Sequence, residues 1–492
     1  MATNGHSNGT HVAGELCFDH FKQYIDGVSV KTTQQRHGIN PATQEALWPV
    51  PVSGAEHLDR AVEAAKRAQA IWKKMSFQER REKVLAYADA VERYREQFTT
   101  LLTTENGKPL WQASIEAGYT IDWIRGMADF EIPEDVIKET AARKVVVRYT
   151  PIGVVGAIVP WNFPLMLAAA KIAPALLTGN VVIVKPSPFA PYCGLKLVEL
   201  AQKFFPPGVV QSLSGGDVLG PMLTTHIGVD KISFTGSTAT GKAVMKSCAS
   251  TLKRVVLELG GNDPAIICPD VDIAKVAPKV ALFAFLNTGQ ICLNMKRIYI
   301  HKDIKDEFLR AMVKHLETMT VGNGLEKGVV LGPLQNDMQY NRVQTYFDDI
   351  PKEKWKVVCG GEGQMKNNKG YFVSPTIIDE PPEKSRIVVE EPFGPIVPAL
   401  AWDDESDVIR RANDTRLGLG ASVWSKDVSR AERIARQLEA GSVWINNHFD
   451  LSPMAPFGGH KESGIGAEWG LNGLKAMCNV QSIFYNKNAD DV

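Results

Sequence analysis

Apolar residues recur every three or four positions through residues 55–105, and charged residues fill the positions between them. This spacing is typical of amphipathic helices and predicts two of them, over residues 55–75 and 77–105. From residue 152 onward the pattern changes, because short and almost wholly apolar runs alternate with amphipathic stretches. The apolar runs predict buried strands, and the stretches between them predict helices that cover those strands.

This alternation forms two series along the chain. The strand-like runs of the first series are VVGAIV, VVIVK, KISFTG and RVVLEL, within residues 152–259. Those of the second series are PAIICP, KRIYIH, ASVWS and GSVWIN, from about residue 263 to 446. Such series predict an α/β protein with two tandem open domains and mostly parallel sheets. Two further runs, RKVVVRYTP (143–151) and CNVQSIFYN (478–486), predict strands that pair either with each other or with another subunit.

Composition narrows the class of protein. The 492 residues include 55 Lys plus Arg and 55 Asp plus Glu, a balance that indicates no nucleic-acid partner. The seven cysteines are scattered without zinc-type spacing, so we expect no metal, and reduced thiols suggest a cytoplasmic protein. Residues 1–14 are polar and predict a disordered tail without a targeting signal. Residues 152–177 are apolar, but Pro160, Pro164 and Pro174 interrupt them, so we expect no membrane span.

One cysteine, Cys292 of FLNTGQICLNMKR (285–297), differs from the others in its setting. An apolar helical stretch, VALFAFL, runs toward it, and a Gly-Gln pair directly precedes it. A cysteine that only packs needs neither feature, whereas a nucleophile benefits from a chain that can turn sharply beside it. Two chemistries fit this setting. One is a Cys–His hydrolase with His448 or His460 as the base. The other is thiol-dependent aldehyde oxidation, which needs an oxyanion donor, a base for water and a nicotinamide.

Polar residues follow several of the predicted strands, where ligands collect in an open parallel sheet. Lys185 ends VVIVK and is either a ligand contact or a lysine that extends to solvent. Glu258 ends RVVLE, and if it is buried its pKa should be raised, which suits a general base; otherwise it is an exposed strand-end glutamate. Asn162 lies between two prolines in PWNFP, where its amide is either an oxyanion donor or a helix cap.

The stretch KISFTGSTATGKAV predicts a strand, a Gly-Ser turn at Gly236 and Ser237, and a helix. Free amides at such a helix start can hold a phosphate or a pyrophosphate. The string also resembles the GxxxxGK of a P-loop nucleoside triphosphatase, but Ala243 follows Lys242 where a magnesium-binding Ser or Thr should stand. The P-loop is therefore disfavoured, and the phosphate site remains an open interpretation beside an ordinary strand–helix turn.

Taken together, these motifs resemble the aldehyde dehydrogenase superfamily, in its NAD(P)-dependent, non-acylating form. The resemblance rests on PWNFPL, GNVVIVKPS, ISFTGST, LELGGNDP, GQIC, EEPFGP and PFGGHKESGIG, which stand in the family's order. It implies a Rossmann-like cofactor domain, a catalytic domain and a small bridging sheet that joins subunits into a homodimer or homotetramer. The implied boundaries are 15–130 and 152–258 for the cofactor domain, 259–472 for the catalytic domain, and 131–151 with 473–488 for the bridging sheet.

The resemblance also implies roles for individual residues. Cys292 looks like the nucleophile, Asn162 and the Cys292 amide look like the oxyanion hole, Glu258 looks like the base for water, and Glu468 looks like a proton relay. The implied cofactor contacts are Lys185, Gly236, Ser237, Gly241, Trp161, Pro160, Ser187, Pro188, Leu259, Glu391 and Phe393. The implied substrate tunnel is apolar and is lined by Phe163, Met166, Ala170, Ile291, Leu293, Leu451 and Phe457.

The activity implied by the resemblance is oxidation of an aldehyde to a carboxylic acid through a thiohemiacetal and a thioester. The apolar tunnel favours an aliphatic or aromatic aldehyde. Pro188 stands where many members have an acid that binds the adenosine ribose, so we expect NAD as cofactor with NADP also open. Ala170 replaces a bulky aromatic and is expected to widen the tunnel. A coenzyme-A-acylating member and an inactive member remain as alternatives; the retained Glu258 argues against both.

Overall fold

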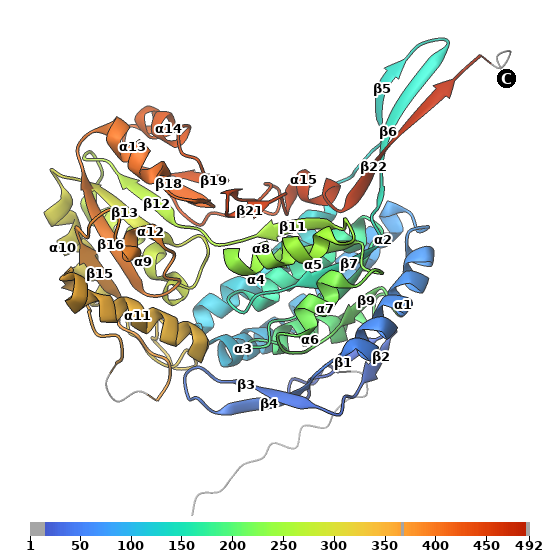
Figure 1. Cartoon of the computed structure of the whole chain (residues 1–492), viewed down its shortest axis with the longest axis horizontal. Helices are drawn as coiled ribbons and strands as arrows, with labels where there is room; N and C mark the ends of the chain where they lie inside the picture. The colour runs from blue at the N-terminus through green and yellow to red at the C-terminus, as the bar shows by residue number, and fades with distance from the viewer. Residues whose placement is uncertain (1–14, 366–368, 489–492) are drawn as a thin grey trace, which may run out of the picture.

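Two lobes, each built around its own sheet, lie side by side in the computed structural model, and a narrow arm projects from one of them (Figure 1). The structure describes residues 15–365 and 369–488. The predicted disordered tail, residues 1–14, lies outside the described residues. Two sheets with helices on their faces and a small third sheet confirm the predicted fold class. The domain boundaries expected from the sequence stay a prediction.

The sheet of the first lobe has six strands in the order β21-β11-β10-β7-β8-β9. Five of them run parallel, and β21, which comes from the C-terminal part of the chain, pairs antiparallel with β11 at the edge. The strands are β7 (Val154–Ile158), β8 (Val181–Lys185), β9 (Val210–Ser212), β10 (Lys231–Thr235), β11 (Arg254–Glu258) and β21 (Gly464–Ile465). The four runs predicted as buried strands form β7, β8, β10 and β11, because a strand covered on both faces is apolar along its length. The short strands β9 and β21 were not predicted.

Helices cover both faces of the first sheet. They are α1 (Ala55–Trp72), α2 (Phe77–Arg93), α3 (Arg95–Asn106), α4 (Leu110–Ala128), α5 (Pro164–Leu177), α6 (Tyr192–Ala201), α7 (Leu219–Thr225), α8 (Thr238–Ala249) and α15 (Gly470–Lys475). The prediction of a single helix over residues 77–105 was wrong, because Tyr94 ends α2 and begins α3. Its backbone leaves the helical region there, at φ −103° and ψ 18°.

The sheet of the second lobe has seven strands in the order β14-β15-β16-β13-β12-β18-β19. All neighbours are parallel except β14, which is antiparallel to β15. The strands are β12 (Asp263–Ile267), β13 (Met295–His301), β14 (Lys356–Cys359), β15 (Thr376–Asp379), β16 (Ile396–Trp402), β18 (Gly420–Trp424) and β19 (Ser442–Ile445). The helices are α9 (Ile273–Phe285), α10 (Lys305–Leu316), α11 (Asp337–Glu353), α12 (Arg386–Val389), α13 (Glu405–Asn413) and α14 (Val428–Ala435).

The arm is a three-stranded antiparallel sheet of β5 (Asp135–Glu139), β6 (Arg143–Pro151) and β22 (Cys478–Asn486). The two runs that lay outside both series pair with each other along their whole length, from Cys478 opposite Pro151 to Asn486 opposite Arg143. The arm leaves the body and places the C-terminal strand at its edge (Figure 1). Several of its apolar side chains are exposed, Phe484 to 68% and Val480 to 65%.

Short strands complete the fold. They are β1 (Gln23–Ile25), β2 (Val28–Val30), β3 (Gln35–Ile39), β4 (Ala46–Pro51), β17 (Leu417–Gly418) and β20 (His460–Lys461). The β3–β4 hairpin runs beneath the first lobe toward the second (Figure 1), and the Tyr371 amide of the second lobe donates to the Pro41 carbonyl at its tip. Among the described residues, no helix has both the length and the apolar character to cross a membrane.

Candidate active site

The C-terminal edge of the first sheet gathers the polar residues that the sequence singled out. The chain order along the sheet reverses at β7, because β8 lies on one side of it and β10 on the other. Ligands of open α/β sheets bind at such a switch point. Asn162 follows β7, Lys185 ends β8, Gly236 follows β10 and Glu258 ends β11, so one edge carries all four.

Cys292 reaches this edge from the second lobe, on a strained turn between α9 and β13. Asn287 and Thr288 both have left-handed backbones, with φ of 51° and 57°. A branched side chain rarely adopts that conformation, so the surroundings must hold it. The Thr288 hydroxyl donates to the Gly332 carbonyl at 2.8 Å, and the Asn287 amide donates to the Gln112 side chain at 3.1 Å. Strain of this kind gathers at functional sites.

The thiol of Cys292 is partly buried and makes no hydrogen bond within the described part of the chain. Burial raises its pKa to about 12. The Lys296 ammonium acts in the opposite direction, while the carboxylates of Glu391, Asp263 and Glu258 raise the pKa further. The thiol is therefore protonated at neutral pH, and a base must take its proton before it can attack.

Asn162 links the first lobe to the cysteine turn. Its side-chain amide donates to the Gln290 carbonyl at 3.0 Å, two residues before Cys292. An amide nitrogen carries two hydrogens, so one remains for a further acceptor. The backbone carbonyl of Asn162 accepts from Lys108 Nζ at 2.9 Å, and Lys108 pairs with the fully buried carboxylate of Glu116. Glu116 also accepts from the Leu165 amide at 3.0 Å, at the start of α5.

Glu258 is the general-base candidate, and the structure buries it. Glu258 is only 3% exposed, and neither of its carboxylate oxygens has a hydrogen-bond partner among the described residues. Burial raises its pKa well above the usual value, the neighbouring Glu468 carboxylate raises it further, and Lys171 lowers it. Lys171 Nζ lies 2.5 Å from the Glu468 carboxylate, which also accepts from the Ser233 hydroxyl at 2.5 Å. Glu258, Glu468 and Lys171 thus form one buried cluster of electrostatically coupled ionisable groups.

The remaining edge of the first sheet carries the expected cofactor residues. Ser237 caps α8 by accepting from the Thr240 amide at 3.2 Å, and the Gly236 amide donates to the Glu258 carbonyl at 3.0 Å. A Cβ at Gly241 would stand 2.4 Å from the Leu259 side chain, so glycine lets α8 approach the end of β11. Burial lowers the pKa of Lys185 to about 8. Its ammonium makes one long contact, 3.4 Å to the Pro186 carbonyl.

Trp161 and Phe393, from the two lobes, face each other across the site. Their ring centroids lie 5.4 Å apart and the ring planes are almost perpendicular. Glu391, two residues before Phe393, accepts from the Gly261 amide at 3.1 Å. Lys296 Nζ lies 2.9 Å from the Glu391 carboxylate and 2.5 Å from the Cys292 carbonyl. The structure therefore joins Glu391 to the cysteine segment through a buried lysine.

The expected tunnel residues lie in the apolar core around Cys292. Met166, Ala170, Ile291, Leu293 and Phe457 are buried there, and Phe163 and Leu451 pack against it. Ala170 is 1% exposed, and the greater tunnel width expected beside it stays a prediction. Two further aromatic contacts involve this set. Phe449 lies 6.2 Å from the Phe163 ring, and Trp469 stacks on Phe457 at 4.4 Å.

The alternative chemistries find little support in the geometry. His448 Nε2 donates to the Leu293 carbonyl at 2.5 Å, and burial lowers the pKa of His448 to about 4. No hydrogen bond joins it to Cys292 among the described residues. His460 is exposed on β20. Lys242 of the P-loop-like string pairs with Glu462 at 3.0 Å and is largely exposed. A Cys–His dyad and a P-loop lysine are therefore both disfavoured.

Several polar residues of the site were missed in the sequence. They are Lys171, Lys296, Lys108, Glu116 and Arg36. The first four are buried charges inside or beside apolar stretches, and that is the only signal the sequence offers for them. Arg36 comes from β3, far from Lys185 in sequence, yet its charge acts on the pKa of Lys185. The residues next to Lys185 in the sequence gave no sign of this second cation, Arg36.

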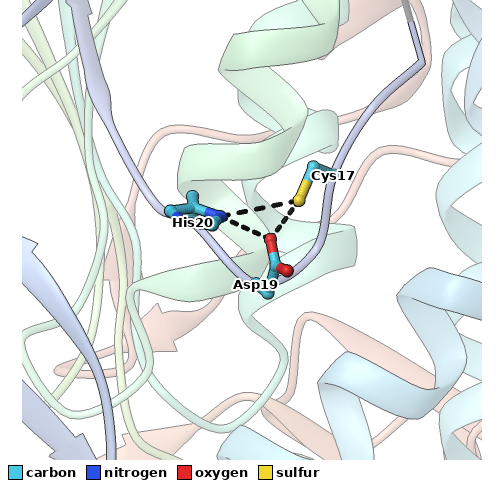
Figure 2. A group of neighbouring side chains, drawn as sticks. All are labelled: Cys17, Asp19 and His20. Carbon is cyan, nitrogen blue, oxygen red and sulfur yellow. Dashed lines mark hydrogen bonds and ion pairs between the residues drawn. The ribbon is translucent and has the colours of Figure 1, made fainter. Parts of the chain in front are cut away.

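A separate group of potential metal ligands lies before β1, outside this site. Figure 2 shows the Asp19 carboxylate between the Cys17 thiol and the His20 ring. His20 Nδ1 lies 2.5 Å from Asp19 and 3.7 Å from the Cys17 sulfur, and the thiol also hydrogen-bonds to Asp19. Asp19 and His20 are more than half exposed. The three side chains contact one another, and no contact among residues 15–365 and 369–488 links them to Cys292.

Comparison with known proteins places these features in context. The profile of the Aldehyde dehydrogenase family matches residues 28–483. An aldehyde dehydrogenase, LUC3, from a Fusarium species is 41% identical over 470 residues, which cover 96% of this chain and 100% of that protein. A phenylacetaldehyde dehydrogenase from Pseudomonas fluorescens is 36% identical over 480 residues and 94% of each chain.

Solved structures give the same result. An NAD⁺ complex of an aldehyde dehydrogenase from Bacillus cereus is 36% identical, with a TM-score of 0.92 over 95% of this chain and 96% of that one. An NAD⁺ complex of betaine aldehyde dehydrogenase from Staphylococcus aureus is 33% identical, with a TM-score of 0.93 over 96% of each chain.

Proposed function

The chain belongs to the aldehyde dehydrogenase family, and on that premise we propose that it oxidises an aldehyde to the carboxylic acid through a thioester on Cys292. One observation carries the proposal. Cys292 stands on a strained turn, and the Asn162 side-chain amide donates to the Gln290 carbonyl two residues before it. The buried Glu258 carboxylate has no hydrogen-bond partner among the described residues. A nucleophile, an oxyanion donor and a base are the three protein groups that this reaction needs.

We propose NAD⁺ as the electron acceptor, and the two solved relatives, both NAD⁺ complexes, support this choice. The chain offers groups that fit a dinucleotide: the buried Lys185 ammonium with one long contact, the Ser237-capped start of α8, and Glu391 at the cysteine turn. Free amides at a helix start suit a pyrophosphate. When bound, the nicotinamide supplies the acceptor for the hydride that leaves the substrate carbon. Pro188 supplies no carboxylate against a 2′-phosphate and Arg36 adds a cation near Lys185, so NADP⁺ should also be used.

The protein groups would act in sequence. Cys292, once deprotonated, attacks the aldehyde carbon, and the second hydrogen of the Asn162 amide stabilises the oxyanion. After oxidation the substrate is a thioester on the sulfur. Glu258 then takes a proton from water, which hydrolyses the thioester and frees the thiol. Glu468, which accepts a hydrogen bond from the Lys171 ammonium and is electrostatically coupled to Glu258, would receive the proton.

The substrate class follows from the apolar surroundings of Cys292. Aliphatic and aromatic side chains from both lobes pack around it, and the Phe163 and Phe449 rings lie 6.2 Å apart. An uncharged aliphatic or aromatic aldehyde fits such a lining better than a charged one.

We also propose that the arm pairs subunits into a homodimer or homotetramer. Its strands β5 and β22 expose Val136, Ile137, Val480 and Phe484, each to more than half. A projecting sheet with apolar faces and an unpaired edge is typical of an assembly surface. Size-exclusion chromatography with light scattering tests this, and a monomer at micromolar concentration would contradict it.

A panel of aldehydes tests the reaction itself. Aliphatic, aromatic and charged aldehydes are incubated with NAD⁺ or NADP⁺, with and without coenzyme A, and reduced nicotinamide and products are measured. We expect carboxylic acid from apolar aldehydes at a rate independent of coenzyme A. An acyl-coenzyme-A product would favour an acylating member, and absence of reduction with every aldehyde would favour an inactive one.

A further inference from the structure

Lys296 is a buried cation between the cysteine segment and the carboxylate of Glu391. Its side chain is 3% exposed, and its ammonium lies 2.5 Å from the Cys292 carbonyl and 2.9 Å from Glu391. The same ammonium lies 5.9 Å from the centre of the Phe393 ring. Burying a lysine is costly unless its charge is paired, so each of these contacts stabilises the charged form.

The contacts place Lys296 next to both halves of the proposed chemistry. The Lys296 ammonium contacts the backbone carbonyl of Cys292, so it also lies near the sulfur of the same residue. Glu391, held by Lys296, also accepts from the Gly261 amide at 3.1 Å. A Cβ at Gly260 would stand 2.1 Å from the Glu391 carboxylate, so the carboxylate has little room to move on that side.

We propose that Lys296 is a positioning residue that fixes Glu391 for the cofactor and stabilises the thiolate of Cys292. The inference rests on the proposed function, since it takes Cys292 as the nucleophile and Glu391 as a cofactor contact. Lys296 touches neither substrate nor cofactor in this scheme. It acts through the two residues that do.

The charges around the thiol decide the direction of the effect. Asp263 from β12, Glu258 from β11 and Glu391 from the loop before β16 all raise the pKa of Cys292, and Lys296 from β13 lowers it. His448 packs nearby but is neutral, because burial lowers its pKa to about 4. Lys296 is thus the cation among the largest influences on the pKa of the thiol. Its removal should raise that pKa further, because the three carboxyl groups remain.

The test measures alkylation of Cys292 by iodoacetamide in the cofactor-free full-length protein across pH. Peptide mass spectrometry separates Cys292 from the other cysteines. A positive charge a few ångströms from a thiol lowers the thiol pKa by about one unit or more. At pH values below the pKa of Cys292, Lys296→Met should therefore slow alkylation about ten-fold. Lys296→Arg keeps the cation and should stay close to wild type. Lys302→Met, at the far end of β13, removes an exposed lysine and serves as the matched control.

The direction of the change separates this role from a structural one. Burial is the largest cause of the raised pKa, so a loosened site would expose the thiol, lower its pKa and speed alkylation. Unchanged or faster alkylation in Lys296→Met would overturn the thiolate role. Calorimetry with NAD⁺ tests the second role, where we expect about ten-fold weaker binding; unchanged binding overturns it. Aldehyde turnover by Cys292→Ala would instead refute the proposed function, whatever the alkylation rates.

Discussion

Glu258→Gln removes a base while changing the shape of the site very little. Glutamine has nearly the volume of glutamate, and the two carboxylate oxygens that it alters make no hydrogen bond with the described residues. The substitution also removes a carboxyl group that burial and Glu468 hold above its usual pKa. We therefore expect the variant to fold with near-wild-type stability, so that any loss of activity reflects chemistry.

The size of the effect follows from the role. A positioned general base contributes about 10²–10⁴ in rate, so thioester hydrolysis should slow at least about 100-fold, or about 2.7 kcal/mol. The steps before hydrolysis keep their nucleophile and oxyanion donor. Rapid mixing with aldehyde and NAD⁺ should then give a burst of reduced nicotinamide followed by a slow steady state. Intact-protein mass spectrometry should show the acyl group on Cys292.

The pH dependence gives a second signature. Only the ionised carboxylate can accept a proton from water, and the pKa of Glu258 is raised, so wild-type hydrolysis should increase with pH well above the usual glutamate range. Glu258→Gln should lose this dependence. Glu462→Gln, a partly exposed glutamate paired with Lys242, is the control and should behave as wild type. Wild-type turnover by Glu258→Gln without an acyl adduct would refute the assignment.

Three further substitutions test other parts of the site. Pro188→Glu adds a carboxylate that can bind a ribose hydroxyl and repel a 2′-phosphate, so the kcat/KM ratio of NAD⁺ to NADP⁺ should rise about ten-fold or more; an unmoved ratio would place selectivity elsewhere. Lys171→Met removes the cation that lowers the pKa of Glu258, so the pH profile of hydrolysis should move to higher pH. Lys108→Met leaves the buried Glu116 carboxylate unpaired and should cost about 3–5 kcal/mol in urea unfolding. Adding Glu116→Gln should recover part of that loss, and no recovery would argue against the pair.

Eight strands of the two sheets, β7, β8, β10, β11, β12, β13, β18 and β19, could be predicted because buried parallel strands are apolar along their length. The short strands β9 and β21 and the strands β14, β15 and β16 were missed. β6 and β22 matched the runs at residues 143–151 and 478–486 at both ends. Other elements gave weaker signals. α4 contains Gly118 and Gly126, and its two ends carry little charge. Its helical repeat of apolar residues was therefore missed in the sequence. Tyr94 is neither glycine nor proline, so the sequence carries no breaker signal for the end of α2.

The site residues that could be predicted are those that directly follow or end a predicted strand. Asn162, Lys185, Gly236 and Glu258 meet because the ends of parallel strands share one edge. Their charged partners could not be read in the same way. The Lys171–Glu468 ion pair joins residues that are 297 positions apart, and no local pattern records it. The location in the cytoplasm and the roles of the individual residues stay predictions.

The central claim is that Cys292 carries the substrate, and the most direct measurement is aldehyde-dependent reduction of NAD⁺ by Cys292→Ala. We expect no turnover, while calorimetry shows NAD⁺ binding close to wild type. Cys359→Ala is the matched control, since Cys359 is a partly buried thiol on β14 of the second lobe, and it should keep full activity. Substantial turnover by Cys292→Ala would contradict the account, because no thioester could then form on that sulfur.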